Sequence, residues 1–288
     1  MTAGRAAATV KALGRGMLPK WLLARLRLAK LDRLVKSYRA REVRHTYGGV
    51  ELTIHLADPL AEGWYDHDWP ELSEIALLKR HRLGPGAVVF DLGAHQCVVA
   101  LVLADIVGRR GRVVAIEASP HNAAAGLRNR ILNGAEQLIV VNAAAAAERG
   151  RLIVNRGLNA QVDDGSGAWG RRDVPALSID DLTRTYGAPD VLFIDVEGFE
   201  CQVLRGARDS LAQQPDCFVE VHAGVGLERL GGTADDVLGF FPPEAYDRFI
   251  SREENGEFVP LARGAVLPST RFFLVAIGRD QSGRRAPR

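Results

Sequence analysis

The chain has 288 residues, of which 47% are hydrophobic and 25% are charged, and its formal net charge is +2. This composition is typical of a soluble globular protein, and no apolar run reaches the roughly 20 residues that a membrane-spanning helix needs. The three cysteines form no C-x-x-C pair and no even framework, which indicates a reducing compartment. We therefore expect a cytoplasmic protein with buried free thiols.

The charge is unevenly spread, because residues 1–45 carry +10 and the remaining residues carry −8. Within this basic arm, residues 19–42 have the spacing of an amphipathic helix. Its apolar stripe is Trp21, Ala24, Leu28, Leu31, Val35 and Tyr38. The stripe could pack on its own domain, dimerise or lie on an anionic membrane, which would make the protein peripheral to the membrane. No aromatic surface for base stacking accompanies the charge, so nucleic acid is not an expected partner.

Residues 46–85 are expected to form a hairpin around Gly48-Gly49, followed by a short helix that leads into the core. The core is expected over 86–278, and residues 279–288 are expected to be a disordered tail. The predicted strands of the core cover 87–91, 112–117, 137–142, 190–195 and 216–222, and the predicted helices of the core cover 97–107, 120–132 and 198–213. Such alternation predicts an α/β fold with a parallel sheet covered on both faces. Two further strand-like pieces flank a glycine-rich segment, residues 156–173, that is typical of a substrate loop.

A glycine turn follows the first core strand in AVVFDLGAHQC, residues 87–97. It lacks the three glycines of a dinucleotide site, which disfavours an NAD(P)-dependent oxidoreductase. Asp91 would repel a phosphate but attract an ammonium group, and Gly93 would let a ligand approach the backbone. Glu117 ends the next strand, where a carboxylate can accept hydrogen bonds from ribose hydroxyls. A ligand with an amino-acid end and a ribose fits, and S-adenosylmethionine has both.

Several segments resemble, in order and spacing, the FkbM family of S-adenosylmethionine-dependent methyltransferases. They include VVFDLGAHQC, VVAIEASPHNAAAGLRNRILN, DVLFIDVEGFECQVLRGA and DCFVEVH. The resemblance implies a Rossmann-like, seven-stranded class I methyltransferase sheet with an antiparallel last strand, and O-methylation of a small molecule, sugar or glycan. It places the cofactor at Asp91, Gly93, His95, Glu117 and Asn142. Where the family pattern has asparagine and glycine, this chain has His95 and Cys97, and Cys97 puts a side chain where helix and cofactor approach.

Asp195 ends the fourth core strand, and Glu220 and His222 end the fifth. Ligands of open α/β sheets bind beyond these carboxyl ends, so we expect the three side chains to converge there and act as the catalytic group. We favour a general base with its orienting acid over a dedicated divalent metal site such as one for Mg²⁺. Glu197 and Glu200 could instead serve the positive end of the following helix. The alternative function is a catalytically impaired family member that acts as a membrane- or protein-binding adaptor through its basic arm.

Overall fold

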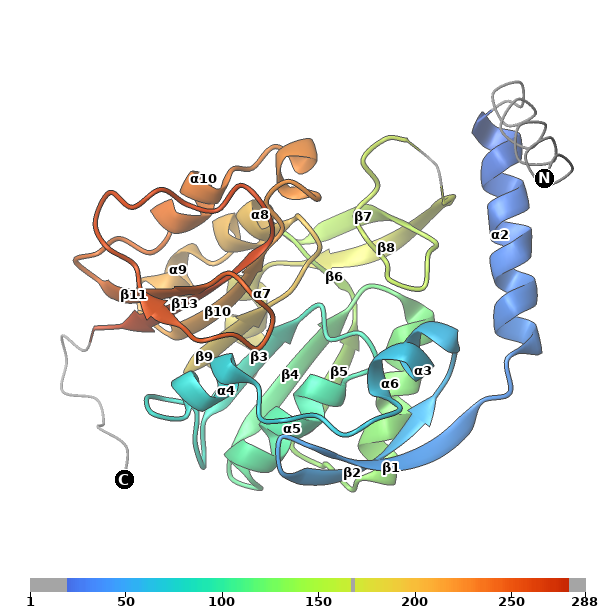
Figure 1. Cartoon of the computed structure of the whole chain (residues 1–288), viewed down its shortest axis with the longest axis horizontal. Helices are drawn as coiled ribbons and strands as arrows, with labels where there is room; N and C mark the ends of the chain where they lie inside the picture. The colour runs from blue at the N-terminus through green and yellow to red at the C-terminus, as the bar shows by residue number, and fades with distance from the viewer. Residues whose placement is uncertain (1–19, 167–168, 280–288) are drawn as a thin grey trace, which may run out of the picture.

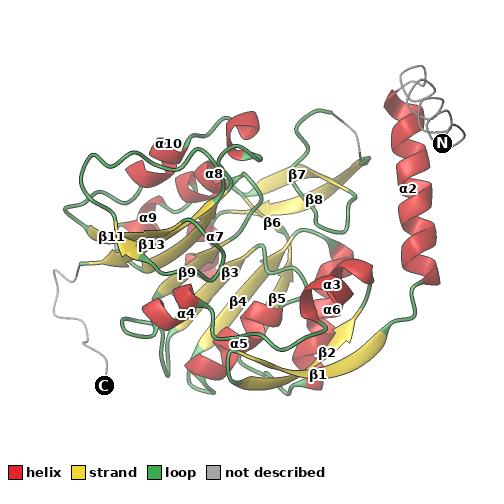
Figure 2. Ribbon diagram, viewed as in Figure 1, coloured by secondary structure: helices red, strands yellow, loops and turns green. Residues whose placement is uncertain are grey.

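The computed structural model describes residues 20–166 and 169–279, and one large sheet organises it (Figures 1 and 2). Within the described residues this sheet has eight strands, in the order β12-β11-β13-β10-β9-β3-β4-β5. Their bounds are β3 Val88–Leu92, β4 Arg112–Glu117, β5 Leu138–Asn142, β9 Val191–Ile194, β10 Asp216–Val221, β11 Tyr246–Ser251, β12 Val259–Pro260 and β13 Phe272–Gly278. The strands from β10 to β5 run parallel, and β13 lies antiparallel to both of its neighbours.

The sheet is mostly parallel, with its last strand antiparallel, as the sequence predicts. The short β12 at its edge is one strand more than the seven expected. The carboxyl ends of β3 and β9 lie side by side in register, since Leu92 pairs with Ile194. Asp91 and Asp195, at the ends of these two central strands, therefore belong to one edge of the sheet.

Helices cover both faces of this sheet, because side chains alternate along its strands. Their bounds are α2 Lys20–Ser37, α3 Pro59–Tyr65, α4 Ser73–Leu78, α5 Val98–Val107, α6 Pro120–Leu132, α7 Ile179–Tyr186, α8 Glu200–Arg205, α9 Arg208–Leu211 and α10 Ala234–Gly239. Val89 points to the face that buries α4, α5 and the N-terminal hairpin. Phe90 points to the opposite face, where it packs with α7, α8 and α10.

The N-terminal hairpin pairs β1 (Arg41–Tyr47) with β2 (Val50–Leu56) through Gly48 and Gly49, which have φ values of +60° and +88°. Strand β1 begins at Arg41, five residues before the predicted start of the hairpin at residue 46. The predicted helix over 198–213 is also interrupted. The chain divides into α8 and α9 on either side of Gly206 and Ala207. Gly206 lies so close to the backbone of Ala146 that a Cβ at this position would be 2.4 Å from the Ala146 carbonyl oxygen.

A separate small sheet, in the order β6-β8-β7, stands above the carboxyl edge of the large sheet (Figure 1). It consists of β6 Ala144–Ala145, β7 Gly150–Asn155 and β8 Arg171–Leu177. Strand β7 matches the first predicted strand-like piece, residues 151–155, whereas the second, residues 175–180, overlaps β8 only at 175–177 and ends in α7. Strands β7 and β8 flank the long loop, of which 156–166 and 169–170 are described.

Helix α2 lies beside this loop and contacts it (Figure 1). A Cβ on Gly170 would lie 2.5 Å from Cδ1 of Leu28, and the guanidinium carbon of Arg27 lies 5.8 Å from the centre of the Trp169 ring. The predicted stripe is the less exposed face of the helix from Ala24 onward. Within the described part of the chain, no helix combines the length and hydropathy needed to cross a membrane. The predictions for residues 1–19 and 280–288 fall outside the described residues.

Candidate functional site

The glycine turn after β3 is fixed by contact with the end of β9. Gly93 has a φ of +93°, and a Cβ there would lie 1.7 Å from the carbonyl oxygen of Asp195. No side chain fits at this position, so glycine is required whether or not a ligand binds. The close approach that the sequence predicts at Gly93 is thus, in the structure, an approach to the backbone of Asp195. The turn and the predicted catalytic aspartate are in direct contact.

Asp91 stands at the end of β3 as a buried carboxylate. Asp91 is 4% exposed, and no described residue hydrogen-bonds to its Oδ2. Desolvation raises the pKa of Asp91 to about 7. A buried carboxylate oxygen without a partner is costly unless a ligand or an ion satisfies it. The structure therefore has an unmatched acceptor at the position predicted to meet an ammonium group.

Glu117 ends β4 and holds the turn together. Its Oε2 accepts a hydrogen bond from the backbone N–H of His95 at 2.8 Å, and its Oε1 accepts one from that of Ser119 at 2.6 Å. Burial raises the pKa of Glu117 to about 7, although these two hydrogen bonds oppose the shift. Asn142 lies next to Glu117 on β5, but it is exposed and donates to the carbonyl oxygens of Glu117 and Ala118.

An aromatic wall from α3 covers the turn, and the sequence interpretation missed it. The hydroxyl of Tyr65 lies 2.7 Å from Nδ1 of His95, and the Trp64 and His95 ring centres are 4.8 Å apart. The buried Asp58, which caps α3, accepts a hydrogen bond from Nε2 of Gln96 at 2.7 Å and so ties α3 to the same turn. The signal was the aromatic run GWYDHDW ahead of the core. Burial lowers the pKa of His95 to about 4, so its ring is neutral at pH 7.

Asp195, Glu220 and His222 converge at the carboxyl edge of the sheet, as predicted. One ligand atom from each lies within 4.8 Å of the other two. Nε2 of His222 is 3.7 Å from Oδ1 of Asp195 and 3.5 Å from Oε1 of Glu220. His222 is buried, whereas the side chain of Asp195 keeps 40% of its surface exposed. The cluster is thus open to a ligand on the Asp195 side.

Two further carboxylates, from the loop and helix after β9, complete this cluster. Glu200 is fully buried and its Oε1 lies 2.7 Å from Nδ1 of His222. Glu197, with a φ of +55°, places its Oε2 3.5 Å from Nε2 of the same ring. The sequence suggested that both glutamates could interact with the positive end of the following helix. The structure instead places both carboxylates beside the imidazole of His222. The spacing E-G-F-E after β9 was the available signal, but it does not reveal the ring between the two side chains.

The carboxylates control the protonation of His222. Burial alone would lower the pKa of His222, but the hydrogen bond to Glu200 and the charges of Glu200, Asp195 and Glu197 raise it to about 9. The imidazole is therefore protonated at pH 7 in this arrangement and has no free lone pair. This disagrees with the predicted role of His222 as a free base. Desolvation and the charge of Glu220 also raise the pKa of Asp195.

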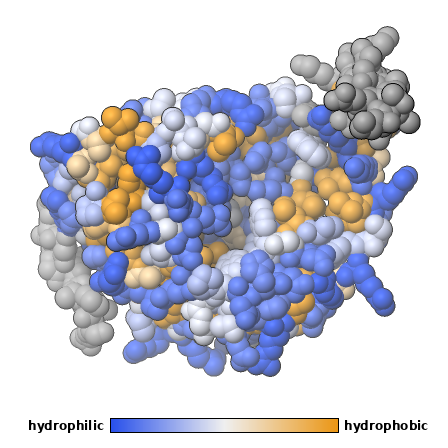
Figure 3. Space-filling view, viewed as in Figure 1, coloured by the Kyte–Doolittle hydropathy of each residue, from blue (hydrophilic) through white to orange (hydrophobic). Residues whose placement is uncertain are grey.

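A polar cavity of about 190 Å³ adjoins the cluster and shares Glu197 with it. It is lined by Asn155, Gln161, Val162, Asp163, Asp164, Ser166, Trp169, Glu197, Gly226, Arg229 and Leu230. Glu197 accepts hydrogen bonds from Nδ2 of Asn159 at 2.5 Å and Nε2 of Gln161 at 2.9 Å, so it joins the β7–β8 loop to the cluster. The face that carries the small sheet is largely polar and is hollowed near its centre (Figure 3).

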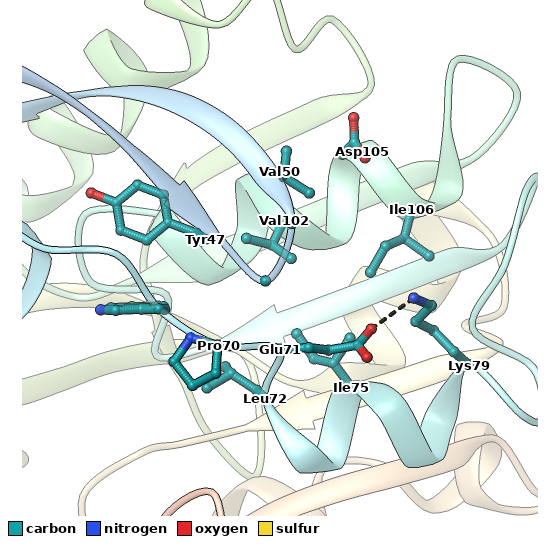
Figure 4. A pocket seen from close by; sticks show the side chains of 13 residues that line it. Tyr47, Val50, Pro70, Glu71, Leu72, Ile75, Lys79, Val102, Asp105 and Ile106 are labelled. Carbon is teal, nitrogen blue, oxygen red and sulfur yellow. Dashed lines mark hydrogen bonds and ion pairs between the residues drawn. The ribbon is translucent and has the colours of Figure 1, made fainter.

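A second cavity of about 190 Å³ lies under the hairpin turn, between β2, α4 and α5 (Figure 4). Apolar side chains such as Val50, Ile75 and Val102 line it, and the Lys79–Glu71 ion pair closes one side at 2.7 Å. Because Val102 to Ile106 belong to the later part of α5, this cavity lies toward the amino ends of the parallel strands. It is therefore remote from the edge where the predicted site residues meet.

The order of the sheet, its glycine turn and the acidic strand ends define a class I methyltransferase-like α/β fold. The sequence profile described as Methyltransferase FkbM domain matches residues 91–248, which is more than half of the chain. The chain belongs to the FkbM methyltransferase family.

The comparison with solved structures finds only weak likenesses. A methyltransferase FkbM from Methylobacillus flagellatus KT is 19% identical with a TM-score of 0.44, and the match covers 66% of this chain and 43% of that one. A fibrillarin from Aeropyrum pernix, solved with natively bound S-adenosyl-L-methionine, is 14% identical with a TM-score of 0.45 and coverage of 85% and 86%. A SAM-dependent methyltransferase from Aquifex aeolicus is 13% identical with a TM-score of 0.40 and coverage of 72% and 89%. No curated protein matches the sequence.

Proposed function

We propose that this chain transfers a methyl group from S-adenosylmethionine to a hydroxyl group of a small polar molecule, sugar or glycan. The observation that carries the proposal is the contact between Gly93 and the backbone of Asp195. It brings the turn with the unmatched Asp91 carboxylate next to the cluster of Asp195, Glu220 and His222. A donor site and an acceptor site at adjacent strand ends are what a direct group transfer requires.

The residues of the turn fit the cofactor. The free Oδ2 of Asp91 matches the ammonium of its amino-acid end. Each carboxylate oxygen of Glu117 accepts one backbone hydrogen bond, so each has the capacity to accept another from a ribose hydroxyl. Tyr65 and Trp64 form an aromatic wall beside His95. When bound, S-adenosylmethionine supplies an electrophilic methyl group on its sulfonium.

The acceptor is proposed to enter through the cavity that shares Glu197. Its lining of amide and carboxylate side chains suits a molecule with several hydroxyl groups, and Trp169, which is 43% exposed, gives it an aromatic surface. Because His222 is protonated, the proton of the acceptor hydroxyl is proposed to pass to a carboxylate. Asp195 is the best candidate, since its side chain is partly exposed and its raised pKa makes it a stronger base than an ordinary aspartate.

The test is a transfer assay with methyl-labelled S-adenosylmethionine and a panel of polyols, monosaccharides, oligosaccharides and matched amines. We expect label in hydroxylated acceptors, and we expect Asp195→Asn to lower turnover by about 10²–10⁴-fold with cofactor affinity nearly unchanged. Glu136→Gln, an exposed carboxylate paired with Arg109, is the matched control. Label that enters only the amines would contradict oxygen methylation.

A further inference from the structure

His222 is held as a fixed ring that presents one nitrogen to a group of carboxylates. Its side chain is 5% exposed, and Glu200 binds Nδ1 at 2.7 Å from a fully buried position. Nε2 points into the cluster, where its nearest carboxylate oxygens, on Glu197, Glu220 and Asp195, lie at 3.5, 3.5 and 3.7 Å. These distances exceed the ordinary range of about 2.7–3.2 Å for a hydrogen bond. Nε2 therefore faces these carboxylate oxygens without forming a hydrogen bond of ordinary length to any of them.

The same space contains a second unmatched atom. Oδ1 of Asp195 is buried and has no hydrogen-bond partner among the described residues. The carboxyl group of Asp195 comes from the loop after β9, and Glu220 and His222 come from the end of β10 and the residue after it. Donors bound to one cation at about 2.1 Å lie about 3–4.3 Å apart. The separations of 3.5–3.7 Å around Nε2 fall in this range, and all three ligand atoms lie within 4.8 Å of one another.

The number of acidic side chains in the cluster also favours a bound cation. Four carboxylates, Asp195, Glu197, Glu200 and Glu220, surround one imidazole. Among the described residues, the further positive group that pairs with these carboxylates is Arg271, which binds Oε1 of Glu220 at 2.9 Å but also binds Glu254 at 3.2 Å. Acidic side chains therefore outnumber basic ones in this cluster. Partly buried negative charge of this kind is stabilised by a bound metal ion.

We propose that Asp195, Glu220 and Nε2 of His222 bind a divalent cation, with Glu200 fixing the imidazole from behind. Two carboxylates favour Mg²⁺ or Mn²⁺, and the nitrogen ligand shifts the preference toward Mn²⁺. A carboxylate behind a ligating histidine is a common arrangement that sets the orientation of the ring. The cation takes the place of the proton on Nε2, and one oxygen of Asp195 stays free for the acceptor hydroxyl.

The catalytic use of this cation rests on the proposed methyl transfer, whereas its binding does not. A hydroxyl that coordinates a divalent cation loses its proton more readily. In that step the new carbon–oxygen bond forms as the carbon–sulfur bond breaks, and the hydroxyl proton moves to the free oxygen of Asp195. Binding can therefore be measured without any acceptor.

The experiment is a titration of the chelator-treated full-length protein with Mn²⁺, in which electron paramagnetic resonance follows the free ion. We expect saturable binding of one equivalent, and we expect Asp195→Asn and Glu220→Gln each to weaken it at least tenfold. Glu200→Gln should weaken it by about 10–100-fold, the usual effect of removing a partner behind a ligand. Glu136→Gln is the charge-matched control and should bind as the unaltered protein does.

Circular dichroism of every variant shows that it is folded, and the near-isosteric substitutions keep the shape of the site. Absence of saturable Mn²⁺ binding in the folded protein would overturn the proposal, as would equal affinities in Asp195→Asn and Glu136→Gln. Calorimetry with S-adenosylmethionine separates the two proposals. Mn²⁺ binding without cofactor binding would support the cation site and contradict the proposed methyl transfer. Full methyl transfer in the presence of a chelator would support the enzyme and contradict the catalytic use of the cation.

Discussion

The sulfur of Cys97 lies against the bare Cα of Gly126. Cys97 is fully buried at the start of α5 with a φ of +64°, and a Cβ on Gly126 of α6 would lie 2.5 Å from its Sγ. The side chain that replaces the family's glycine therefore points into the contact between α5 and α6. The effect of Cys97 on the approach of the cofactor stays a prediction.

This pair gives the first prediction. Gly126→Ala should destabilise the protein by about 1–3 kcal/mol, because the added methyl group overlaps the thiol. Cys97→Gly in the Gly126→Ala background should restore most of that loss, since it removes the overlap and suits the positive φ. Urea unfolding of both single variants and the double variant gives the coupling energy, expected at about 1–3 kcal/mol. Gly63→Ala, in α3 with open space around it, is the control and should be neutral or slightly stabilising. Strictly additive effects would show that the two residues do not share this space.

The second prediction concerns the cofactor. Asp91→Asn and Glu117→Gln should each weaken binding of S-adenosylmethionine by about 1–3 kcal/mol, the usual cost of losing a hydrogen bond to a charged group. Isothermal calorimetry measures this directly. Asp105→Asn, an exposed carboxylate on α5, should leave the affinity unchanged. If millimolar cofactor gives no heat with the unaltered protein, the turn does not hold this ligand.

The third prediction is a pH dependence that arises from Asp91. The folded pKa of about 7 lies above the unfolded value of about 3.9. Its contribution to stability is therefore fully present below about pH 4 and is lost as the pH rises through 7. Asp91→Asn cannot ionise, so its stability relative to the unaltered protein should increase between pH 5 and 8. Each pKa unit corresponds to about 1.4 kcal/mol, which limits the total to about 4 kcal/mol.

Urea unfolding of the ligand-free protein at several pH values measures this difference. Cofactor affinity should change in the opposite sense, because only the ionised carboxylate attracts an ammonium group. Affinity of the unaltered protein should therefore rise as the pH increases through about 7, and that of Asp91→Asn should rise less. A stability difference that is constant with pH would mean that Asp91 is ionised throughout.

The fourth prediction concerns helix α2. Because Leu28 contacts Gly170 and Arg27 lies over Trp169, we expect the helix to support the loop that lines the polar cavity, and not a membrane. Removal of residues 1–39 keeps β1 whole, whereas a cut at residue 46 would remove most of it. The shortened protein should show a raised KM for the acceptor, and it should sediment with anionic vesicles to the same extent as the full chain. Greater sedimentation of the full chain would favour a membrane contact.

The sequence by itself determined the frame of this protein. The apolar runs predict β3, β4, β5, β9 and β10 within one or two residues, because a strand buried on both faces must be continuously apolar. The same reasoning located the long loop between β7 and β8. It also predicted that Asp195, Glu220 and His222 meet, since parallel strands end at a common edge. Strand β11 and helices α3, α7 and α10 were not predicted, because their patterns are short and their stability comes from packing.

Only the tertiary structure decided what the meeting residues can do. Glu200 and Glu197 follow β9 in the chain, and nothing in their spacing shows that the ring of His222 lies between them. That placement raises the pKa of His222 to about 9, which disfavours a free base at this position. In the same way, the spacing of the sequence does not reveal that the sulfur of Cys97 lies against Gly126. In both cases the decisive quantity is a distance of a few ångströms between side chains from different elements, which sequence spacing does not specify.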